Sequence, residues 1–254
     1  MKEHTYPILF RVEQSHWWHT GRRKIIASFV EDICRRVTDR RPRILDVGCG
    51  TGANLLMLSQ YGDAEGVDIS EDALAFCHER GLANVKLGAG EELPYDDGTF
   101  DLVTALDVVE HMDDDLAGLR EMRRVLRPGG RVLLFVPTFM FLWGVQDDVS
   151  HHRRRYRLAE LRRVLERAGF EVERTTYANI TFFLPILLVR KLMRLTGIKA
   201  ESENNINVSA LNGLLARVLG AESVVLKIMN IPFGVSGLCV ARVKNTDQGG
   251  FENG

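Results

Sequence analysis

An α/β fold built on a parallel sheet is expected for this chain of 254 residues. From residue 43 to residue 137, short apolar runs alternate with stretches of helical periodicity, which is typical of parallel strands joined by right-handed helical crossovers. With 45% hydrophobic residues, the chain can also bury a sizeable core. We therefore expect one domain that carries an insertion.

The first half of the chain supplies most of the predicted elements. A helix is predicted where apolar residues recur at spacings of three and four, and it should end near Arg41 and Pro42. The apolar positions of this helix are Ile25, Ile26, Phe29, Val30, Ile33 and Val37. The core then follows in the order RILDV, a helix from Ala53, AEGVD, a helix from Glu71, NVKL, FDLVTAL, a helix from about Asp114 to Leu126, and RVLLFVP.

The second half contains the expected insertion. A loop after Pro137 leads to a helix near Leu158 to Ala168 and to the strand FEVERTTYA, and GVSGLCVARV at 234–243 is the last expected strand. Two helix candidates, FFLPILLVRKLMRLTG and NVSALNGLLARVLG, lie between these strands as a cap or an interface. The predicted division is 1–42 as an N-terminal lid and helix, 43–180 as the core, 181–232 as the helical insertion, 233–243 as the last strand and 244–254 as a disordered tail.

Composition excludes several classes of protein. A net charge of −1 argues against nucleic acid as the main partner. The four cysteines form no C-x-x-C pair, which disfavours a disulfide framework and a thiolate zinc site and favours a reducing cytoplasm. We expect no signal peptide in MKEHTYPILFRV, and the longest apolar run, FFLPILLV, is far shorter than the roughly 20 residues of a membrane span.

The stretch ILDVGCGTG is a glycine-rich turn entered from an apolar strand. Gly48, Gly50 and Gly52 allow a sharp turn and a close approach of a ligand to the backbone. The same residues fit the dinucleotide pattern G-x-G-x-x-G/A, so the turn alone leaves two ligands open, a nicotinamide or flavin dinucleotide and an adenosyl sulfonium. Asp68, 18 positions after Gly50, could bind ribose hydroxyls in both cases.

Five blocks resolve this choice by resemblance. LDVGCGTG, GVDIS, GEELPYDDGTFDLV, DVVEHM and LRPGGRVLLFVP occur in this order. Over about residues 43–180 the chain resembles the class I S-adenosylmethionine-dependent methyltransferases, of the type 11/12 kind and distantly the ubiquinone-type O-methyltransferases. The resemblance implies a Rossmann-like sheet of seven strands with the last one antiparallel, and S-adenosyl-L-methionine as the cofactor.

The resemblance also implies a set of cofactor contacts. Asp46 and the backbone of Gly48, Cys49 and Gly50 would face the methionine part of the cofactor. Asp68 would bind the ribose, and Ile69 would lie against the adenine. Leu106 is a further expected cofactor contact. Family members of the GDAEELPF type have an Asp after the glycine, but here the stretch is Gly88-Ala89-Gly90-Glu91, which leaves the backbone of Gly90 and Glu91 for the adenine. HWWHTGRRK resembles a lid in which Arg22 or Arg23 pairs with the cofactor carboxylate, or else a helix start with both tryptophans in the core.

A methyltransferase must align the nucleophile and, where needed, remove its proton. The base should lie where the fourth and fifth strands end. The candidates there are Asp107, Glu110, His111, Asp147, Asp148, His151 and His152. DVVEH also resembles the metal-binding E-x-x-E-H motif of ubiquinone-type enzymes, which makes Asp107, Glu110 and His111 a candidate metal set, but similar residues often line the cofactor pocket or cap a helix, and we expect no metal.

The expected activity is methyl transfer to an O, N or C nucleophile of a small or lipid-like acceptor. A nicotinamide-dependent oxidoreductase and a non-catalytic, cofactor-binding partner subunit are the alternatives. SHHRRRYR at 150–157 should be a substrate loop or a solvated helix start rather than a nucleic-acid patch. In residues 182–194 an apolar run is followed by Arg190, Lys191 and Arg194, as in interfacial helices, so we expect peripheral membrane contact or a homodimer interface in an otherwise cytoplasmic protein.

Overall fold

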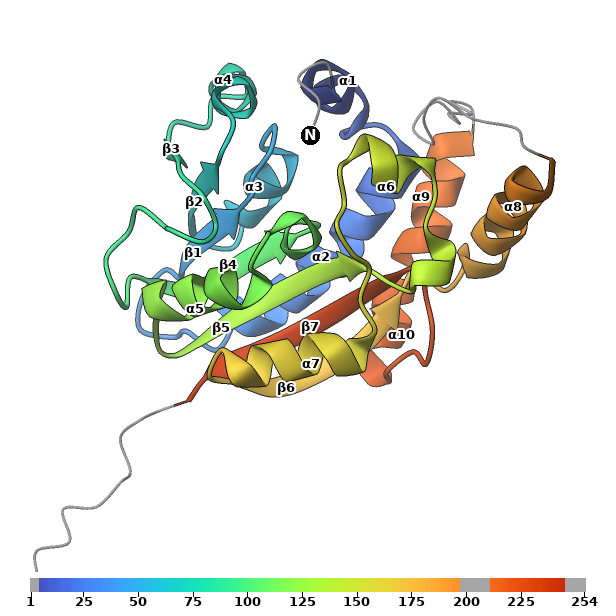
Figure 1. Ribbon diagram of the computed structural model, residues 1–254. Helices are drawn as coiled ribbons and strands as arrows, with labels where there is room; N and C mark the ends of the chain where they lie inside the picture. Colours follow the sequence, from blue (N-terminus) through green and yellow to red (C-terminus); the bar gives the residue numbers. More distant parts are fainter. Residues whose placement is uncertain (1–4, 197–210, 245–254) are drawn as a thin grey trace, which may run out of the picture.

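The computed structural model describes residues 5–196 and 211–244. Figure 1 shows a sheet crossing the molecule with helices on both faces. Seven strands form this sheet in the order β3-β2-β1-β4-β5-β7-β6. The strands are β1 (Arg43–Val47), β2 (Asp63–Asp68), β3 (Val85–Leu87), β4 (Phe100–Leu106), β5 (Leu126–Pro137), β6 (Phe170–Ala178) and β7 (Ser236–Val243).

The strand directions confirm the expected fold. The pairs β1–β2, β1–β4, β2–β3 and β4–β5 are parallel. Strand β7 lies between β5 and β6 and is antiparallel to both. The sheet is therefore Rossmann-like and mostly parallel, and the last strand of the chain is antiparallel, as the sequence predicted.

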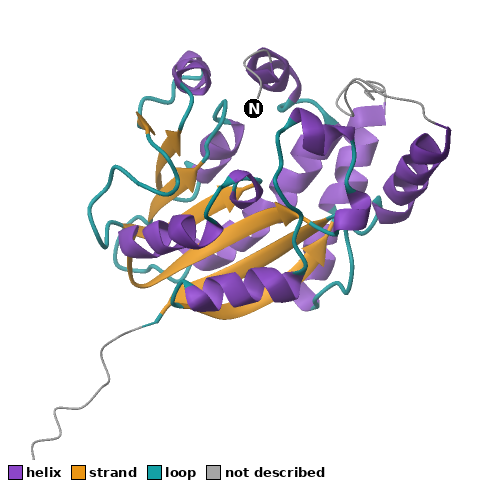
Figure 2. Cartoon of the chain, viewed as in Figure 1, coloured by secondary structure: helices purple, strands orange, loops and turns teal. Residues whose placement is uncertain are grey.

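Helices cover both faces of the sheet, and others lie at the edge where the parallel strands end (Figure 2). They are α1 (Thr5–Val12), α2 (Trp17–Cys34), α3 (Ala53–Leu58), α4 (Glu71–Glu79), α5 (Asp115–Val125), α6 (Val145–Val149), α7 (Leu158–Arg167), α8 (Phe183–Thr196), α9 (Asn212–Gly220) and α10 (Glu222–Ile228), with 3₁₀ turns η1 (Val109–His111) and η2 (Met140–Leu142). Alternate residues of β5 serve the two layers, because successive side chains of a strand point to opposite faces. Val132 and Leu134 pack with α5 and α7, whereas Leu133 and Phe135 pack with α2, α9 and α10.

Several elements differ from the sequence prediction, two of them in their extent or packing. Helix α2 ends at Cys34, about seven residues before the expected end, because the N–H of Val37 bonds the carbonyl of Cys34 in a tighter turn. The second half of the insertion does not stand apart, since Leu219 of α9 packs against Gly21 of α2. The first part of NVSALNGLLARVLG and the predicted disordered tail after residue 244 lie outside the described residues.

The parallel strands end at one edge of the sheet, and several segments gather there. The glycine turn follows β1, Asp68 ends β2, Asp107 follows β4 and Thr138 follows β5. Helices α6 and α8 contribute side chains to a cavity with Asp107 and Pro137. Ligands of open α/β sheets bind at this edge, so the fold directs attention to it.

Candidate functional site

The turn after β1 depends on its glycines. Gly48 and Gly50 have φ angles of 68° and 54°, in the left-handed region that other residues rarely adopt. A Cβ at Gly48 would lie 2.5 Å from Cγ2 of Val108, whereas a Cβ at Gly50 would have no heavy atom within 4 Å. The space beside Gly50 is therefore open, and it fits the close approach of a cofactor to the backbone.

Two buried carboxylates lie beside this turn. Asp68 accepts hydrogen bonds from the N–H groups of Gly50 (2.8 Å) and Ser70 (3.0 Å). Asp46 accepts one from the Thr104 hydroxyl at 2.6 Å. Burial raises the pKa of both groups, that of Asp46 to about 7. A carboxylate can accept about four hydrogen bonds, so Asp68 has capacity for the hydroxyl groups of a ligand.

The remaining predicted cofactor contacts have different environments. Ile69 is 73% exposed beside Asp68, so its side chain is available to a ligand. Gly90 and the half-buried Glu91 lie in the loop after β3, and a Cβ at Gly90 would collide with Met112. Cys49 and Leu106 are buried in apolar clusters, which gives these two side chains a packing role.

Helix α1 packs over the glycine turn. The carboxylate of Glu13, just after α1, accepts hydrogen bonds from the Thr51 hydroxyl and from Arg80. Arg80 also donates from Nε to the Thr51 carbonyl at 2.6 Å, and the rings of Phe10 and Phe76 lie 4.8 Å apart. We did not predict these residues from the sequence, because they belong to no motif and meet only in the folded chain.

The segment HWWHTGRRK forms the start of α2, which begins at Trp17. Arg22 forms an ion pair with Asp107, and its guanidinium lies 4.6 Å from the centre of the Phe135 ring. Arg23 donates to a backbone carbonyl of the N-terminal segment. Both arginines thus have protein partners, and their pairing with a cofactor carboxylate stays a prediction.

A cavity of about 390 Å³ lies where β4 and β5 end, between the start of α2, α6 and α8. One side of it is apolar and aromatic. The apolar lining includes Trp17, Trp18, Phe182, Pro185, Ile186, Val189 and Met193. The polar lining includes Arg22, Asp107, Asp147, His152 and Arg155. Asp107 connects this cavity to the glycine turn, because it lines the cavity and the side chain of the next residue, Val108, lies against Gly48.

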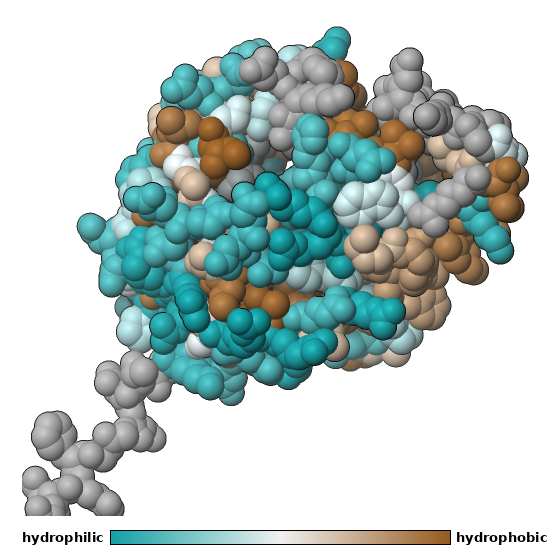
Figure 3. Space-filling view, in the orientation of Figure 1, coloured by the Kyte–Doolittle hydropathy of each residue, from teal (hydrophilic) through white to brown (hydrophobic). Residues whose placement is uncertain are grey.

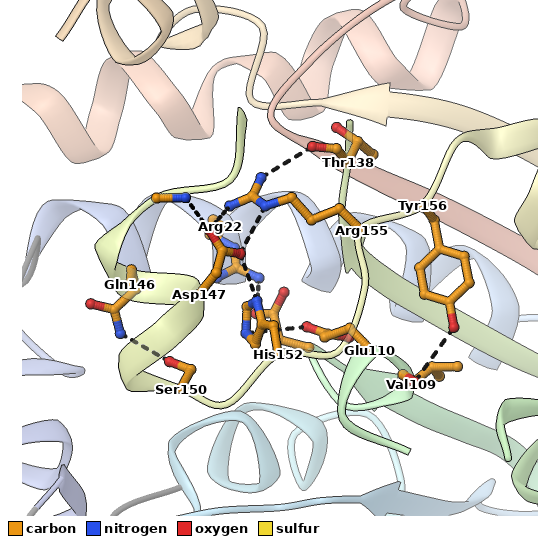
Figure 4. A network of polar contacts seen from close by, with 12 residues as sticks. Arg22, Val109, Glu110, Thr138, Gln146, Asp147, Ser150, His152, Arg155 and Tyr156 are labelled. Carbon is orange, nitrogen blue, oxygen red and sulfur yellow. Dashed lines mark hydrogen bonds and ion pairs between the residues drawn. The ribbon is translucent and has the colours of Figure 1, made fainter. Parts of the chain in front are cut away.

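Asp147 and His152 form an oriented pair in the cavity wall (Figure 4). His152 Nδ1 lies 2.8 Å from Asp147 Oδ1. Arg155 donates to both oxygens of the same carboxylate, at 2.7 and 2.9 Å, and Gly144 N–H donates to one of them at 2.7 Å. Burial acts to raise the pKa of Asp147, but the hydrogen bonds from His152 and Arg155 outweigh it and hold this pKa well below its usual value. Asp147 is therefore an ionised carboxylate that fixes the His152 ring.

Glu110 and His111 lie next to this pair. Oε1 of Glu110 is 3.9 Å from Nε2 of His152, and the rings of His111 and His152 meet edge to face with centroids 4.7 Å apart. Glu110 is fully buried, and neither of its carboxylate oxygens has a hydrogen-bond partner among the described residues. Burial and the charge of Asp107 raise the pKa of Glu110 well above its usual value. Burial and the His152 charge lower the pKa of His111 to about 4, so this imidazole is neutral near pH 7.

One group of side chains could hold a metal ion. The ligand atoms of Glu110, His111 and His152 all lie within 4.8 Å of one another. Two imidazoles and a carboxylate suit ions such as Zn²⁺ or Fe²⁺. The candidate set from the sequence had Asp107 in place of His152, but the carboxylate of Asp107 pairs with Arg22. The group found in the structure therefore contains His152 where the set from the sequence contained Asp107.

The structure also separates the candidate bases. Asp107, Asp147 and His152 line the cavity. His151 is exposed and has a φ of 55°, which directs the chain away from α6. Asp148 accepts a hydrogen bond from Trp143 Nε1 at 2.9 Å. Of the two neighbouring histidines, His152 is therefore the one placed to meet a ligand in the cavity.

Comparisons with known proteins bear on the question of which ligand the glycine turn binds. Residues 45–134 match the family model described as a methyltransferase domain. The uncharacterized methyltransferase YcgJ of Bacillus subtilis is 35% identical over 122 residues, which are 45% of this chain and 48% of that protein. Demethylmenaquinone methyltransferase of Staphylococcus aureus is 41% identical over 99 residues, 36% of this chain and 41% of that protein. These alignments span less than half of each relative.

Solved structures extend the similarity of fold beyond that segment. A SAM-dependent methyltransferase from Thermotoga maritima, described as a possible histamine N-methyltransferase, is 19% identical, with a TM-score of 0.56. The match covers 95% of this chain and 96% of the other. At this identity the likeness shows the fold alone, whereas the family match rests on the sequence of residues 45–134. Residues 45–134 thus match a methyltransferase domain, and the fold around them is the one seen in that solved SAM-dependent methyltransferase.

Proposed function

We propose that this protein transfers a methyl group from S-adenosylmethionine to an oxygen, nitrogen or carbon nucleophile of a small or lipid-like acceptor. The observation that carries the proposal is the Asp147–His152 pair, which lines a cavity beside the glycine turn. The methyltransferase domain at 45–134 supports it. Neither alternative, a nicotinamide oxidoreductase or a non-catalytic subunit, has comparable support.

The residues around the turn fit the cofactor. The open space at Gly50 admits a ligand against the backbone, and Asp68 would accept hydrogen bonds from ribose hydroxyls next to the exposed Ile69. The backbone of Gly48–Gly50 would border the methionine part. When bound, S-adenosylmethionine supplies an electrophilic methyl group on a sulfonium. The chain's own task is then to position the nucleophile and to take its proton.

His152 is the group that we assign to the proton. Because Nδ1 lies against the ionised Asp147, we assign the imidazole proton to Nδ1 and the free lone pair to Nε2. Arg155 holds Asp147 in place with two hydrogen bonds, so the ring keeps this orientation. A base oriented in this way raises the rate by roughly 10²- to 10⁴-fold when the acceptor must lose a proton.

The cavity suggests the shape of the acceptor. Its polar end holds His152, Asp107 and Arg22, and its other walls are tryptophans and the apolar side of α8. An acceptor with a polar, nucleophilic end and an apolar body would match both parts. The name of the Staphylococcus relative, a demethylmenaquinone methyltransferase, agrees with this acceptor class. Residues 182–194 would then be the segment that meets a membrane or a second copy of the chain.

Alanine substitution of the two neighbouring histidines tests the proposal. With labelled S-adenosylmethionine and a panel of small-molecule and lipid extracts, His152→Ala should lose about 10²-fold or more in turnover. Its affinity for S-adenosylhomocysteine should stay unchanged, since His152 lies outside the turn. His151→Ala, the matched control, should keep the wild-type rate because its side chain is exposed.

Two outcomes would contradict this assignment. A fully active His152→Ala enzyme would exclude His152 as the base. Loss of activity on exhaustive chelation would instead indicate a metal on Glu110, His111 and His152, because a histidine base needs no ion. We expect the wild-type enzyme to stay active after chelation.

A further inference from the structure

Helix α8 carries a row of exposed leucines. Leu184, Leu188, Leu192 and Leu195 are each at least 60% exposed and recur at spacings of four, four and three, which places them on one side of the helix. We call these four residues the α8 leucine stripe. Single exposed leucines are normal on a protein surface, but a continuous apolar row marks an interaction site. Figure 3 shows hydrophobic side chains gathered at the α8 end of the molecule.

The opposite side of α8 packs against the rest of the protein. Ile186 and Met193 line the cavity, and the buried Arg190 donates a hydrogen bond to the Leu142 carbonyl. At the start of the helix, the Phe183 ring packs against Phe233 with centroids 5.3 Å apart. The leucine stripe cannot turn inward without breaking these contacts. Any partner of the stripe would therefore come from outside the described residues.

Charge indicates what kind of partner this is. The described parts of the insertion, 181–196 and 211–232, contain one acidic residue, Glu222. It is 5% exposed and accepts hydrogen bonds from the N–H groups of Asn179 and Thr181. The exposed cations include Lys191, Arg217 and Lys227. The described residues of the insertion thus expose apolar and cationic side chains and no carboxylate of their own, although the whole chain has 34 acidic and 33 basic residues. Of these cations, Lys227 lies 4.0 Å from Glu31 of α2, whereas Lys191 belongs to α8 itself.

We propose that α8 docks the protein on the surface of an anionic lipid bilayer, with the leucine stripe at the acyl boundary and Lys191 among the headgroups. Cations beside an apolar row are attracted by anionic lipid. The 14 residues of α8 span roughly 21 Å, less than the roughly 30 Å of a hydrocarbon core. No helix in the described ranges is long and apolar enough to cross a membrane. The helix would therefore lie in the plane of the interface.

This docking rests on the proposed function, because it supplies the acceptor. One side of α8 forms a wall of the cavity and the other side would contact lipid, so a single helix separates His152 from the bilayer. An amphipathic acceptor in the membrane would thus have a short path to the base. A soluble acceptor would need no such surface.

Co-sedimentation of the full chain with vesicles tests the inference. Wild-type protein should pellet with vesicles of equal parts phosphatidylglycerol and phosphatidylcholine, much less with phosphatidylcholine alone, and less as salt increases. Leu188→Glu with Leu192→Glu should weaken binding by about tenfold or more, since it places carboxylates in the stripe. Leu56→Glu with Leu87→Glu, at exposed leucines on α3 and β3, is the matched control and should bind like the wild type.

Three results would overturn the docking. They are wild-type protein that stays in the supernatant with every lipid, a stripe variant that binds as well as the control, and a wild-type dimer that the stripe variant dissociates in sedimentation experiments. Methyl transfer to a detergent-dispersed acceptor separates this inference from the proposed function. Transfer without vesicle binding would reject the docking alone, whereas vesicle binding without any transfer would reject the enzyme assignment alone.

Discussion

At the scale of single residues, Asp46 shows what burial adds to a motif. Its carboxyl lies inside β1, 1% exposed, and burial raises its pKa from 3.8 to about 7. Between these two values the folded chain holds a proton that the unfolded chain has released. The free energy of unfolding should therefore be highest below about pH 4, as far as Asp46 is concerned, and fall as the pH rises through about 7.

The Asp46→Asn variant should lose this part of the pH dependence, because its amide stays neutral. The shift corresponds to up to about 4 kcal/mol between pH 4 and pH 8. Urea unfolding of both proteins without cofactor, at several pH values across that range, measures the difference. Asp113→Asn, at an exposed position, should follow the wild type. Parallel curves for the wild type and Asp46→Asn would show that Asp46 titrates normally.

At the scale of elements, the regular core could be predicted and the site only in part. The alternation of apolar runs and helical patterns predicted all seven strands, and most of them carry residues of the two core layers. Helices α1, α6 and α10 were missed, since their eight, five and seven residues are too few for a clear helical pattern. Asp107, His111, His151 and His152 were proposed as candidates together. Only tertiary contacts separate them, such as the ion pair from Arg22 to Asp107, 85 positions away.

Gly48 and Gly50 of the glycine turn and Gly81 elsewhere all have positive φ, but their surroundings differ, which allows a prediction. Gly48→Ala should lose about 2–4 kcal/mol of stability, because strain in the left-handed region adds to a clash with Val108. Gly50→Ala has open space and should lose about 1 kcal/mol, but its Cβ would occupy the cofactor side of the turn and weaken S-adenosylhomocysteine binding.

Gly81→Ala is the control for backbone strain. Gly81 lies in the turn after α4 with a φ of 80°, and a Cβ added there would have no heavy atom within 4 Å. The variant should show the same loss of about 1 kcal/mol with unchanged cofactor affinity. Urea unfolding and calorimetric titration measure the two quantities. If both variants, Gly50→Ala and Gly81→Ala, bound S-adenosylhomocysteine with equal affinity, the cofactor would not occupy the space beside Gly50.

At the scale of the whole molecule, the N-terminal segment and the sheet together enclose the proposed cofactor site. Glu13 reaches Thr51 in the glycine turn, and the ring of Phe10 lies against Phe76 of α4. Burial and the charge of Asp68 raise the pKa of Tyr6 in the same helix. Helix α1 thus lies over the glycine turn, at the edge where the proposed cofactor would enter.

If α1 must open for the cofactor to enter and leave, Phe10→Ala should speed both steps. The substitution removes the ring contact with Phe76 and the Arg80 guanidinium, which lies 4.2 Å from the ring centre. Together these contacts contribute about 1–3 kcal/mol, so α1 should open about 10- to 100-fold more often. Stopped-flow tryptophan fluorescence with S-adenosylhomocysteine should show both rate constants rising more than the equilibrium constant changes. Ile8→Ala, an exposed position on the same helix, should keep the wild-type rates; unchanged rates in Phe10→Ala would mean that the cofactor enters without moving α1.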